Sequence, residues 1–324
     1  MCDWVDLTNR RRRLMEKFIV PLAFAALLVP ISANADLPPE VAKAVAAMGH
    51  VNDAGATRKI FDPIQPKDPV AGLKVERDIA YGSDPLQKLD VVSSGQGTGK
   101  PVLVFVHGGG FTGGDKHAPG QFTNDNLMKW ANDQGMVGVE INYRLLPKNM
   151  LPDQANDARD ALAWVAQNAA KYGGDPNKIF LWGHSAGASL VGIYVSHPEY
   201  HYKQGGGIIG AVMTSGGYES RPGGIFGTDP DKVKAASSVE GLKKTSIPLF
   251  FTRAEWDPDT PQIAQGEMIH RVLTEAGRDH VFHVMKTHNH MSQIDSVGTS
   301  EHQLTDLLGP WLTARLANAK SSSN

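Results

Sequence analysis

Cysteine is almost absent from this chain of 324 residues, which contains a single one, Cys2. A single cysteine excludes a disulfide within the chain, and no residue other than Cys2 can serve as a thiol nucleophile or a thiolate metal ligand. An excess of basic charge is also absent, because 32 lysines and arginines face 34 aspartates and glutamates, for a formal net charge of −2. Without a basic footprint, nucleic acid is not an expected partner.

The one long apolar run lies near the N-terminus. Four arginines at 10–13 precede an uncharged stretch at 18–33, and the tripeptide Ala-Asn-Ala follows at 33–35. Basic residues, an apolar stretch and a small-x-small site are the three parts of a secretory signal, so residues 1–35 are predicted to be removed on export. Two prolines and a length below the roughly 20 residues of a membrane span disfavour a permanent anchor.

Two alternatives for this segment stay open, a twin-arginine signal and an uncleaved amphipathic anchor, and Met15 is a second possible start. Removal of residues 1–35 takes away Cys2 together with five basic and three acidic residues, so the net charge becomes −4. Export without disulfides suits a bacterial periplasm, where a large domain relies on its core alone. We therefore expect a periplasmic or secreted protein.

The rest of the chain alternates between apolar runs and amphipathic stretches. The runs predict strands at 73–81, 88–92, 102–106, 136–142, 179–182, 208–213, 247–252 and 280–285. The helical periodicity predicts helices at 121–133, 153–172, 186–196, 260–276 and 299–317. Strands that are apolar throughout are buried on both faces, and their alternation with helices is typical of an α/β fold with a doubly wound, mostly parallel sheet. The first two strands look like an antiparallel opening.

We expect residues 36–324 to form one domain. Residues 36–70 are rich in alanine, proline and aspartate and are predicted to cover the body as a short helix and loop. Residues 217–246 have no place in the sheet and could form a small cap over its carboxyl edge. The oligomeric state stays open.

The most informative motif is G-H-S-A-G at 183–187. It follows an apolar strand and leads directly into a helical stretch, and its glycines allow a turn tight enough to expose a serine hydroxyl at the tip. The pentapeptide alone is a weak signal, because its residue types are common. In this strand–turn–helix context it predicts that Ser185 is a nucleophile.

A second motif, H-G-G-G-F at 107–111, follows the buried strand 102–106. Three glycines in a row indicate that the backbone approaches something closely. For a serine hydrolase this is the oxygen of the tetrahedral intermediate, which amides of the loop and of Ala186 would stabilise. The alternatives are a flexible turn or a nucleotide loop, and the following F-T-G-G-D-K is a poor helix start for the latter.

A serine nucleophile needs a base and an orienting acid, each on a loop after its strand. After the strand at 247–252, three carboxylates compete, those of Glu255, Asp257 and Asp259. Asp257 is favoured because the proline after it fixes an extended turn. Asp259 would then cap a helix, and Glu255 would be solvated.

After the last strand, His288 and His290 are candidates for the base, and His290 is favoured because it lies just before the last helix. His280, His283, His288 and His290 could instead suggest a metal site. His280 and His283 have odd spacing on a strand and therefore face opposite sides, and no metal-binding motif occurs. We expect no metal and no cofactor.

Other conspicuous residues have structural explanations. Trp182 is predicted in the core, and His184 is predicted to pack beside the turn without serving as a second base. Tyr143-Arg144 and Asp157 are predicted to form a buried pair that supports the oxyanion loop. Three apolar residues flank the loops and are candidates for the pocket wall: Phe111, Trp256 and Met291.

With these motifs, the chain resembles the α/β-hydrolase superfamily, and more narrowly the carboxylesterase branch with hormone-sensitive-lipase-like esterases, bacterial feruloyl esterases and kynurenine formamidases. The resemblance covers about residues 75–315, and F-T-G-G-D-K at 111–116 and N-H-M-S at 289–292 look closest to the feruloyl-esterase and formamidase side. It departs from the lipase pattern at Met291, where a glycine is usual, and lacks the long N-terminal cap helices.

The resemblance implies a role for six residues. Ser185 would be the nucleophile, Asp257 the acid and His290 the base, and the oxyanion donors would be the amides of Gly109, Gly110 and Ala186. It implies hydrolysis of short acyl or aromatic esters through an acyl-enzyme, with a small-molecule ester as the substrate. The alternatives are an amidase of the formamidase type and a non-catalytic binding protein of the same fold.

Overall fold

The computed structural model describes residues 37–118, 120–223, 226–260 and 265–321. The predicted signal peptide and Cys2 lie outside them. Within these ranges, no helix is both long and apolar enough to cross a bilayer.

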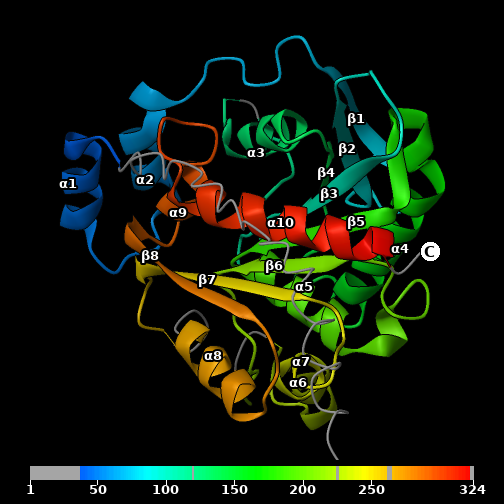
Figure 1. Cartoon of the computed structure of the whole chain (residues 1–324). Helices are drawn as coiled ribbons and strands as arrows, with labels where there is room; N and C mark the ends of the chain where they lie inside the picture. The colour runs from blue at the N-terminus through cyan, green and yellow to red at the C-terminus, as the bar shows by residue number, and fades with distance from the viewer. Residues whose placement is uncertain (1–36, 119, 224–225, 261–264, 322–324) are drawn as a thin grey trace, which may run out of the picture. The chain divides into compact units, whose positions relative to one another are not determined.

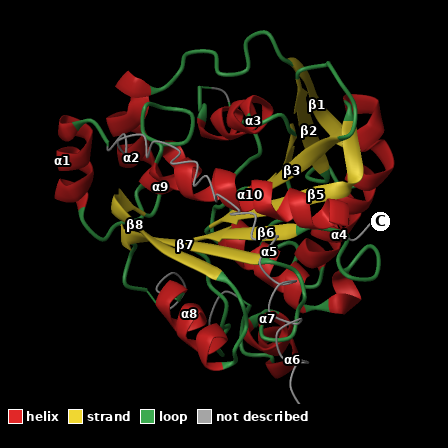
Figure 2. Ribbon diagram, viewed as in Figure 1, coloured by secondary structure: helices red, strands yellow, loops and turns green. Residues whose placement is uncertain are grey.

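A single eight-stranded sheet forms the centre of the fold (Figure 1, Figure 2). Its strand order is β1-β2-β4-β3-β5-β6-β7-β8; β2 is antiparallel to β1 and β4, and all pairs from β4 to β8 are parallel. The strands are β1 (Lys74–Ala80), β2 (Lys88–Ser93), β3 (Lys100–Val106), β4 (Val137–Ile141), β5 (Gly174–His184), β6 (Gly210–Thr214), β7 (Leu249–Trp256) and β8 (Val281–Asn289). The predicted fold class, a mostly parallel α/β sheet with antiparallel first strands, is confirmed.

Helices cover both faces of the sheet. The apolar core has two parts because neighbouring residues of a strand point to opposite faces, as Val104 and Phe105 do. The main helices are α3 (Thr123–Asp133) and α10 (Gln303–Ser321) on one face, and α4 (Asp153–Asn168), α5 (Ala186–Ser196) and α8 (Gly266–Glu275) on the other. Trp182 is fully buried and packs edge-on against Phe105 and Trp130, as predicted for a core residue.

Two strands are longer than their apolar runs. β5 begins at Gly174, because the backbone there pairs with Lys100 before the hydrophobic residues start. β8 continues to Asn289, which pairs with Trp256 at the end of β7. Backbone pairing, and not side-chain hydrophobicity, sets these ends. As a result, the catalytic candidate His290 follows the last strand directly.

The N-terminal covering segment contains more helix than the short helix and loop that we expected. It holds α1 (Pro39–Met48), α2 (Ala54–Phe61) and the 3-10 turn η1 (Asp62–Ile64). Val45 and Phe61 form a separate apolar cluster with residues of α1, and Trp256 packs against it. Residues 217–246 lie outside the sheet and include α6 (Pro230–Ala235) and α7 (Val239–Leu242). The remaining short elements are η2 (Ala169–Tyr172), η3 (Pro198–Tyr200) and α9 (Ser292–Asp295).

Candidate active site

Ser185 lies at the tip of a strained turn between β5 and α5. Its backbone φ is 56°, a positive value that residues other than glycine rarely adopt. Its amide donates to the carbonyl of Thr214 at 2.9 Å, which fixes the turn to β6. A Cβ at Gly187 would lie 2.1 Å from the carbonyl oxygen of Val106, and one at Gly183 would lie 2.3 Å from the carbonyl oxygen of Gly187. Both glycines are therefore required by close approach of the backbone.

Ser185, His290 and Asp257 form one hydrogen-bonded chain. Nε2 of His290 lies 2.9 Å from Oγ of Ser185, and Nδ1 of His290 lies 2.8 Å from Oδ1 of Asp257. His290 is fully buried and Asp257 is 3% exposed, so both interactions are shielded from water. The structure thus brings together three side chains from the ends of β5, β7 and β8.

The other two carboxylates after β7 point elsewhere. Glu255 accepts a hydrogen bond from the amide of Thr287 at 2.8 Å and pairs with Lys286, and Asp259 is exposed. Asp257 alone of the three contacts the histidine.

Of the four histidines considered for a metal site, only His290 reaches the serine. His288 is buried on another side, with Nδ1 at 3.0 Å from Oγ of Ser292 and Nε2 at 3.6 Å from Glu301. His280 contacts His270 at 2.8 Å, and His283 packs on a phenylalanine of β7.

The sequence did not indicate the residues that hold Asp257. Its Oδ2 accepts hydrogen bonds from Oγ of Ser215 at 2.7 Å and from the amide of Ala254 at 2.9 Å. Nε2 of Gln293, one turn after the histidine, donates to the same Ser215 hydroxyl. Ser215 directly follows β6 and has a φ of 50°. The one feature of the sequence that points to Ser215 is its position just after the carboxyl end of a predicted strand.

His184 supports His290, as its predicted place beside the turn suggested. Its Nε2 donates to the carbonyl oxygen of His290 at 2.8 Å, and the two ring centroids are 4.9 Å apart. Burial, together with the neighbouring His290, lowers the pKa of His184 to about 3. His184 is therefore neutral at ordinary pH and acts as a fixed donor.

The glycine-rich loop lies directly beside the serine. A Cβ at Gly108 would lie 3.1 Å from Cβ of Ser185, and Gly109 has a φ of 118° that favours glycine. Within the part of the chain that the structure describes, the amides of Gly109, Gly110 and Ala186 donate to no protein acceptor. These N–H groups are therefore free to bind an oxyanion, as the N–H groups in the first turn of a helix generally are.

The loop rests on two sets of buried interactions. The hydroxyl of Tyr143 donates to the carbonyl of His107 at 3.0 Å, and the two rings stack with centroids 4.6 Å apart. Arg144 donates through Nε to the buried carboxylate of Asp157 at 2.9 Å, which confirms the predicted pair. Burial lowers the pKa of His107, so that ring is neutral.

A charged cluster anchors the far end of the loop. Nζ of Lys116, which is 4% exposed, lies 2.8 Å from the fully buried Asp90 and 2.7 Å from Asp78. Burial disfavours its charge, but the hydrogen bonds to Asp78 and Asp90 prevail and raise the pKa of Lys116. Arg77 bridges Asp90 to Asp125 of α3. The cluster connects the loop to β2 and α3.

The covering segment at 36–70 contacts the loops that carry Asp257 and His290. Nδ1 of His50 donates to the carbonyl oxygen of Asp257 at 2.9 Å. Nδ2 of Asn289, the neighbour of the histidine, donates to Oγ1 of Thr57 at 3.2 Å. Two side-chain hydrogen bonds thus connect the segment to these loops, and it forms one side of the site.

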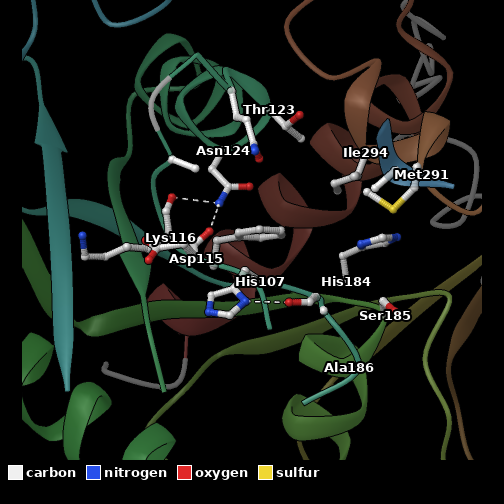
Figure 3. Close-up of a pocket in the computed structure, with 18 of the residues that line it drawn as sticks. His107, Asp115, Lys116, Thr123, Asn124, His184, Ser185, Ala186, Met291 and Ile294 are labelled. Carbon is white, nitrogen blue, oxygen red and sulfur yellow. Dashed lines mark hydrogen bonds between the residues drawn. The ribbon is translucent and has the colours of Figure 1, made fainter. Parts of the chain in front are cut away.

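A cavity of about 760 Å³ opens above Ser185 (Figure 3). Phe111 and Met291 line it, as predicted, but Trp256 does not, because α1 and α2 cover it. From residues 217–246 only Gly217 is in the described wall, although Phe226 packs edge-on against Phe111 with centroids 5.2 Å apart. The wall comes mainly from three stretches, residues 52–58, 105–124 and 184–189.

One family model matches the part of the chain that contains Ser185. Residues 89–199 match the family described as BD-FAE. This range includes the glycine-rich loop and Ser185 and ends before Asp257 and His290.

Curated relatives match part of the chain, between 32% and 51% of its length. Phenmedipham hydrolase of Pseudarthrobacter oxydans is 40% identical over 108 residues, which is 32% of this chain and 21% of that protein. The esterase LipC of Mycobacterium tuberculosis is 36% identical over 129 residues, or 38% of this chain and 31% of that one. The chain spans between 21% and 38% of the length of such relatives.

Solved structures match the whole fold. Esterase B from Lactobacillus rhamnosis superposes with a TM-score of 0.65 and 16% identity, covering 87% of this chain and 95% of that one. A hyperthermophilic esterase from Pyrobaculum calidifontis gives a TM-score of 0.60 and 20% identity, with 88% and 99% coverage. These likenesses establish that the chain has the α/β-hydrolase fold.

Proposed function

We propose that this α/β hydrolase is a serine carboxylic-ester hydrolase that acts through an acyl-enzyme on short acyl or aromatic esters. The observation that carries the proposal is the hydrogen-bonded chain Ser185–His290–Asp257 at the floor of a cavity. The names of the relatives, which are hydrolases and esterases, support the same reaction class.

In the first step, Oγ of Ser185 attacks the ester carbonyl carbon while its proton passes to Nε2 of His290. The negative charge that forms on the carbonyl oxygen is stabilised by the unpaired amides of Ala186, Gly109 and Gly110. Asp257 holds the imidazole in the tautomer whose Nε2 accepts, and stabilises the imidazolium once it forms.

In the second half of the reaction, the C–O bond to the alcohol breaks and the proton on His290 moves to the leaving oxygen. Water then enters, gives its proton to the same Nε2 and attacks the acyl carbon. The second oxyanion collapses, the acid leaves, and the proton returns to Ser185.

The test combines one variant with one label. Ser185→Ala should lower kcat on an aryl acetate by about a thousand-fold or more. A fluorophosphonate probe should label the natural protein and leave the variant unlabelled. Near-natural hydrolysis by the variant would refute the nucleophile. Rates on ferulate esters, acetylated sugars and N-formylkynurenine would then separate an esterase from the formamidase alternative.

Export through residues 1–35 is part of the proposal and is supported by the sequence pattern alone. N-terminal sequencing of the protein from a periplasmic extract should find a chain that begins at Asp36. A chain that starts at Met1 or Met15 in the cytoplasmic fraction would contradict it.

A further inference from the structure

We propose that Arg58 makes the enzyme selective for esters that carry a carboxylate on their acyl or alcohol group. The inference rests on the proposed ester hydrolase function and extends it to a substrate class. Arg58 belongs to α2 and lies in the wall of the same cavity as Ser185.

Among the residues that the structure describes, the guanidinium of Arg58 has no hydrogen-bond or ion-pair partner. Its Nε is buried and forms no hydrogen bond, and no ion pair among the described residues includes this side chain. A buried donor without an acceptor is costly, and an arginine that faces a cavity can recover the loss from a ligand. The cavity therefore presents an unused cation.

The other charges of the cavity wall are already balanced or distant. Lys116 is held between Asp78 and Asp90, and His117 lies 3.4 Å from Asp125. Asp115 is exposed to solvent. Figure 3 shows it on the side of the cavity opposite Met291 and Ile294.

Arg58 is on the side of the catalytic histidine. Its neighbour Thr57 accepts a hydrogen bond from Asn289, and Met291 and Ile294 line the cavity with it. The lowered pKa of His184 has a contribution from the charge of Arg58, after those of burial and His290. A substrate bound to Ser185 and extended toward α9 would therefore meet the guanidinium.

A carboxylate is the anion that fits best. A guanidinium presents planar paired donors that match the two oxygens of a carboxylate, and one unpaired positive charge balances one negative charge. A phosphate monoester carries nearly two charges and would need a second free cation, which the paired Lys116 does not provide.

Asp295 is the competing partner within the protein. It is fully buried on α9, and its Oδ2 has no hydrogen-bond partner, while its Oδ1 accepts from Thr123 at 2.6 Å. If Arg58 served only to balance Asp295, its loss would change stability and affect all substrates alike. The experiment separates these two roles.

Matched ester pairs measure the selectivity. Para-nitrophenyl hydrogen glutarate and para-nitrophenyl pentanoate differ by a carboxylate on the acyl end, and para-carboxyphenyl butyrate and para-tolyl butyrate differ on the alcohol end. In Arg58→Gln, the ratio of kcat/KM for the charged over the neutral ester should fall by roughly ten-fold or more for one of the pairs. Arg58→Lys should restore part of it, and high salt should reduce it in the natural protein.

Arg159→Gln is the matched control, since Arg159 lies on α4 and pairs with Asp160. It should leave both ratios unchanged. An unchanged ratio in Arg58→Gln, or an equal loss on charged and neutral esters with a lower melting temperature, would overturn the inference.

A binding measurement keeps this inference separate from the catalytic proposal. In the Ser185→Ala background, calorimetry should show tighter binding of monoethyl glutarate than of ethyl pentanoate, and addition of Arg58→Gln should abolish the difference. The same comparison of para-carboxyphenyl butyrate with para-tolyl butyrate covers the alcohol end, and equal binding within both pairs would refute the role of Arg58 whatever the nucleophile is. Continued hydrolysis by Ser185→Ala would refute the nucleophile and leave this readout intact.

Discussion

The side chain of His184 donates a hydrogen bond of 2.8 Å to the main-chain carbonyl of His290. The residue before Ser185 thus holds the backbone of His290, and the Nε2–Oγ distance of 2.9 Å depends on a contact between two different loops. Because the contact uses the main chain of His290, it leaves both ring nitrogens of that residue available for Ser185 and Asp257.

His184→Ala should therefore lower kcat by about ten-fold, because a small displacement of the base costs much of the orientation effect. His184→Gln should retain more activity, since its amide nitrogen can replace Nε2 as donor. Steady-state kinetics on an aryl ester measure both. Equal activity of the alanine and glutamine variants would show that the hydrogen bond has no positioning role.

The pKa of about 3 for His184 predicts a change of stability with pH. An unfolded histidine titrates near 6.5, so between these values the unfolded chain binds a proton that the folded chain does not. The free energy of unfolding should therefore fall as the pH is lowered through this range, by up to about 1.4 kcal/mol per pH unit.

His184→Gln isolates this effect, because glutamine does not titrate. In urea unfolding at about pH 7 and about pH 5, the stability advantage of the natural protein over the variant should shrink by roughly 2 kcal/mol. Asp295, whose burial raises its pKa to about 6, contributes with the opposite sign but is present in both proteins. A pH-independent difference would contradict the buried neutral state of His184.

Much of the site was accessible from the sequence because each catalytic candidate lies in a local pattern. Ser185 has glycines that a tight turn requires, and Asp257 and His290 follow apolar strands whose ends meet at one edge of the sheet. The alternatives at Glu255 and His288 could only be separated by seeing what each side chain contacts.

The supporting residues could not be predicted, because they act through neighbours that are distant in the chain. Ser215 belongs to no motif and matters because β6 lies between β5 and β7. Arg58 looks like an ordinary helix residue until α2 is placed beside α9. Its position in the sequence predicts that Trp256 lines the pocket, but it packs instead against the apolar cluster of α1 and α2.

Ser215→Ala should remove one of the hydrogen bonds that position Asp257. Asp257 would keep the amide of Ala254 and lose the hydroxyl at 2.7 Å, and Gln293 would lose an acceptor in a buried site. We expect kcat to fall by about three- to ten-fold, which corresponds to the roughly 1 kcal/mol of one hydrogen bond. Ser196→Ala is the control, since that hydroxyl bonds only within α5. Equal kinetics for both variants would refute the role of Ser215.

Lys116→Met should destabilise the fold by about 3 kcal/mol, because the fully buried Asp90 would lose one of its two cationic partners. Lys171→Met removes an exposed lysine that pairs with Glu76 at the surface and should leave the stability nearly unchanged. Urea midpoints at equal m-values compare the two. A similar loss in both variants would mean that Asp90 does not depend on Lys116.

Gly187→Ala tests whether the turn around Ser185 tolerates any side chain. The added Cβ would lie 2.1 Å from the carbonyl oxygen of Val106 and 2.6 Å from that of His107, both in rigid backbone. Either α5 moves away from β3, which displaces Ser185 from His290, or the protein fails to fold.

Gly309→Ala is the matched control, because it adds a Cβ to α10 in nearly open space and should stabilise the protein by up to about 1 kcal/mol. Circular dichroism and labelling by a fluorophosphonate separate the two outcomes for Gly187→Ala. A folded variant with full labelling would show that the close approach of α5 to β3 is not required for the reactivity of the serine.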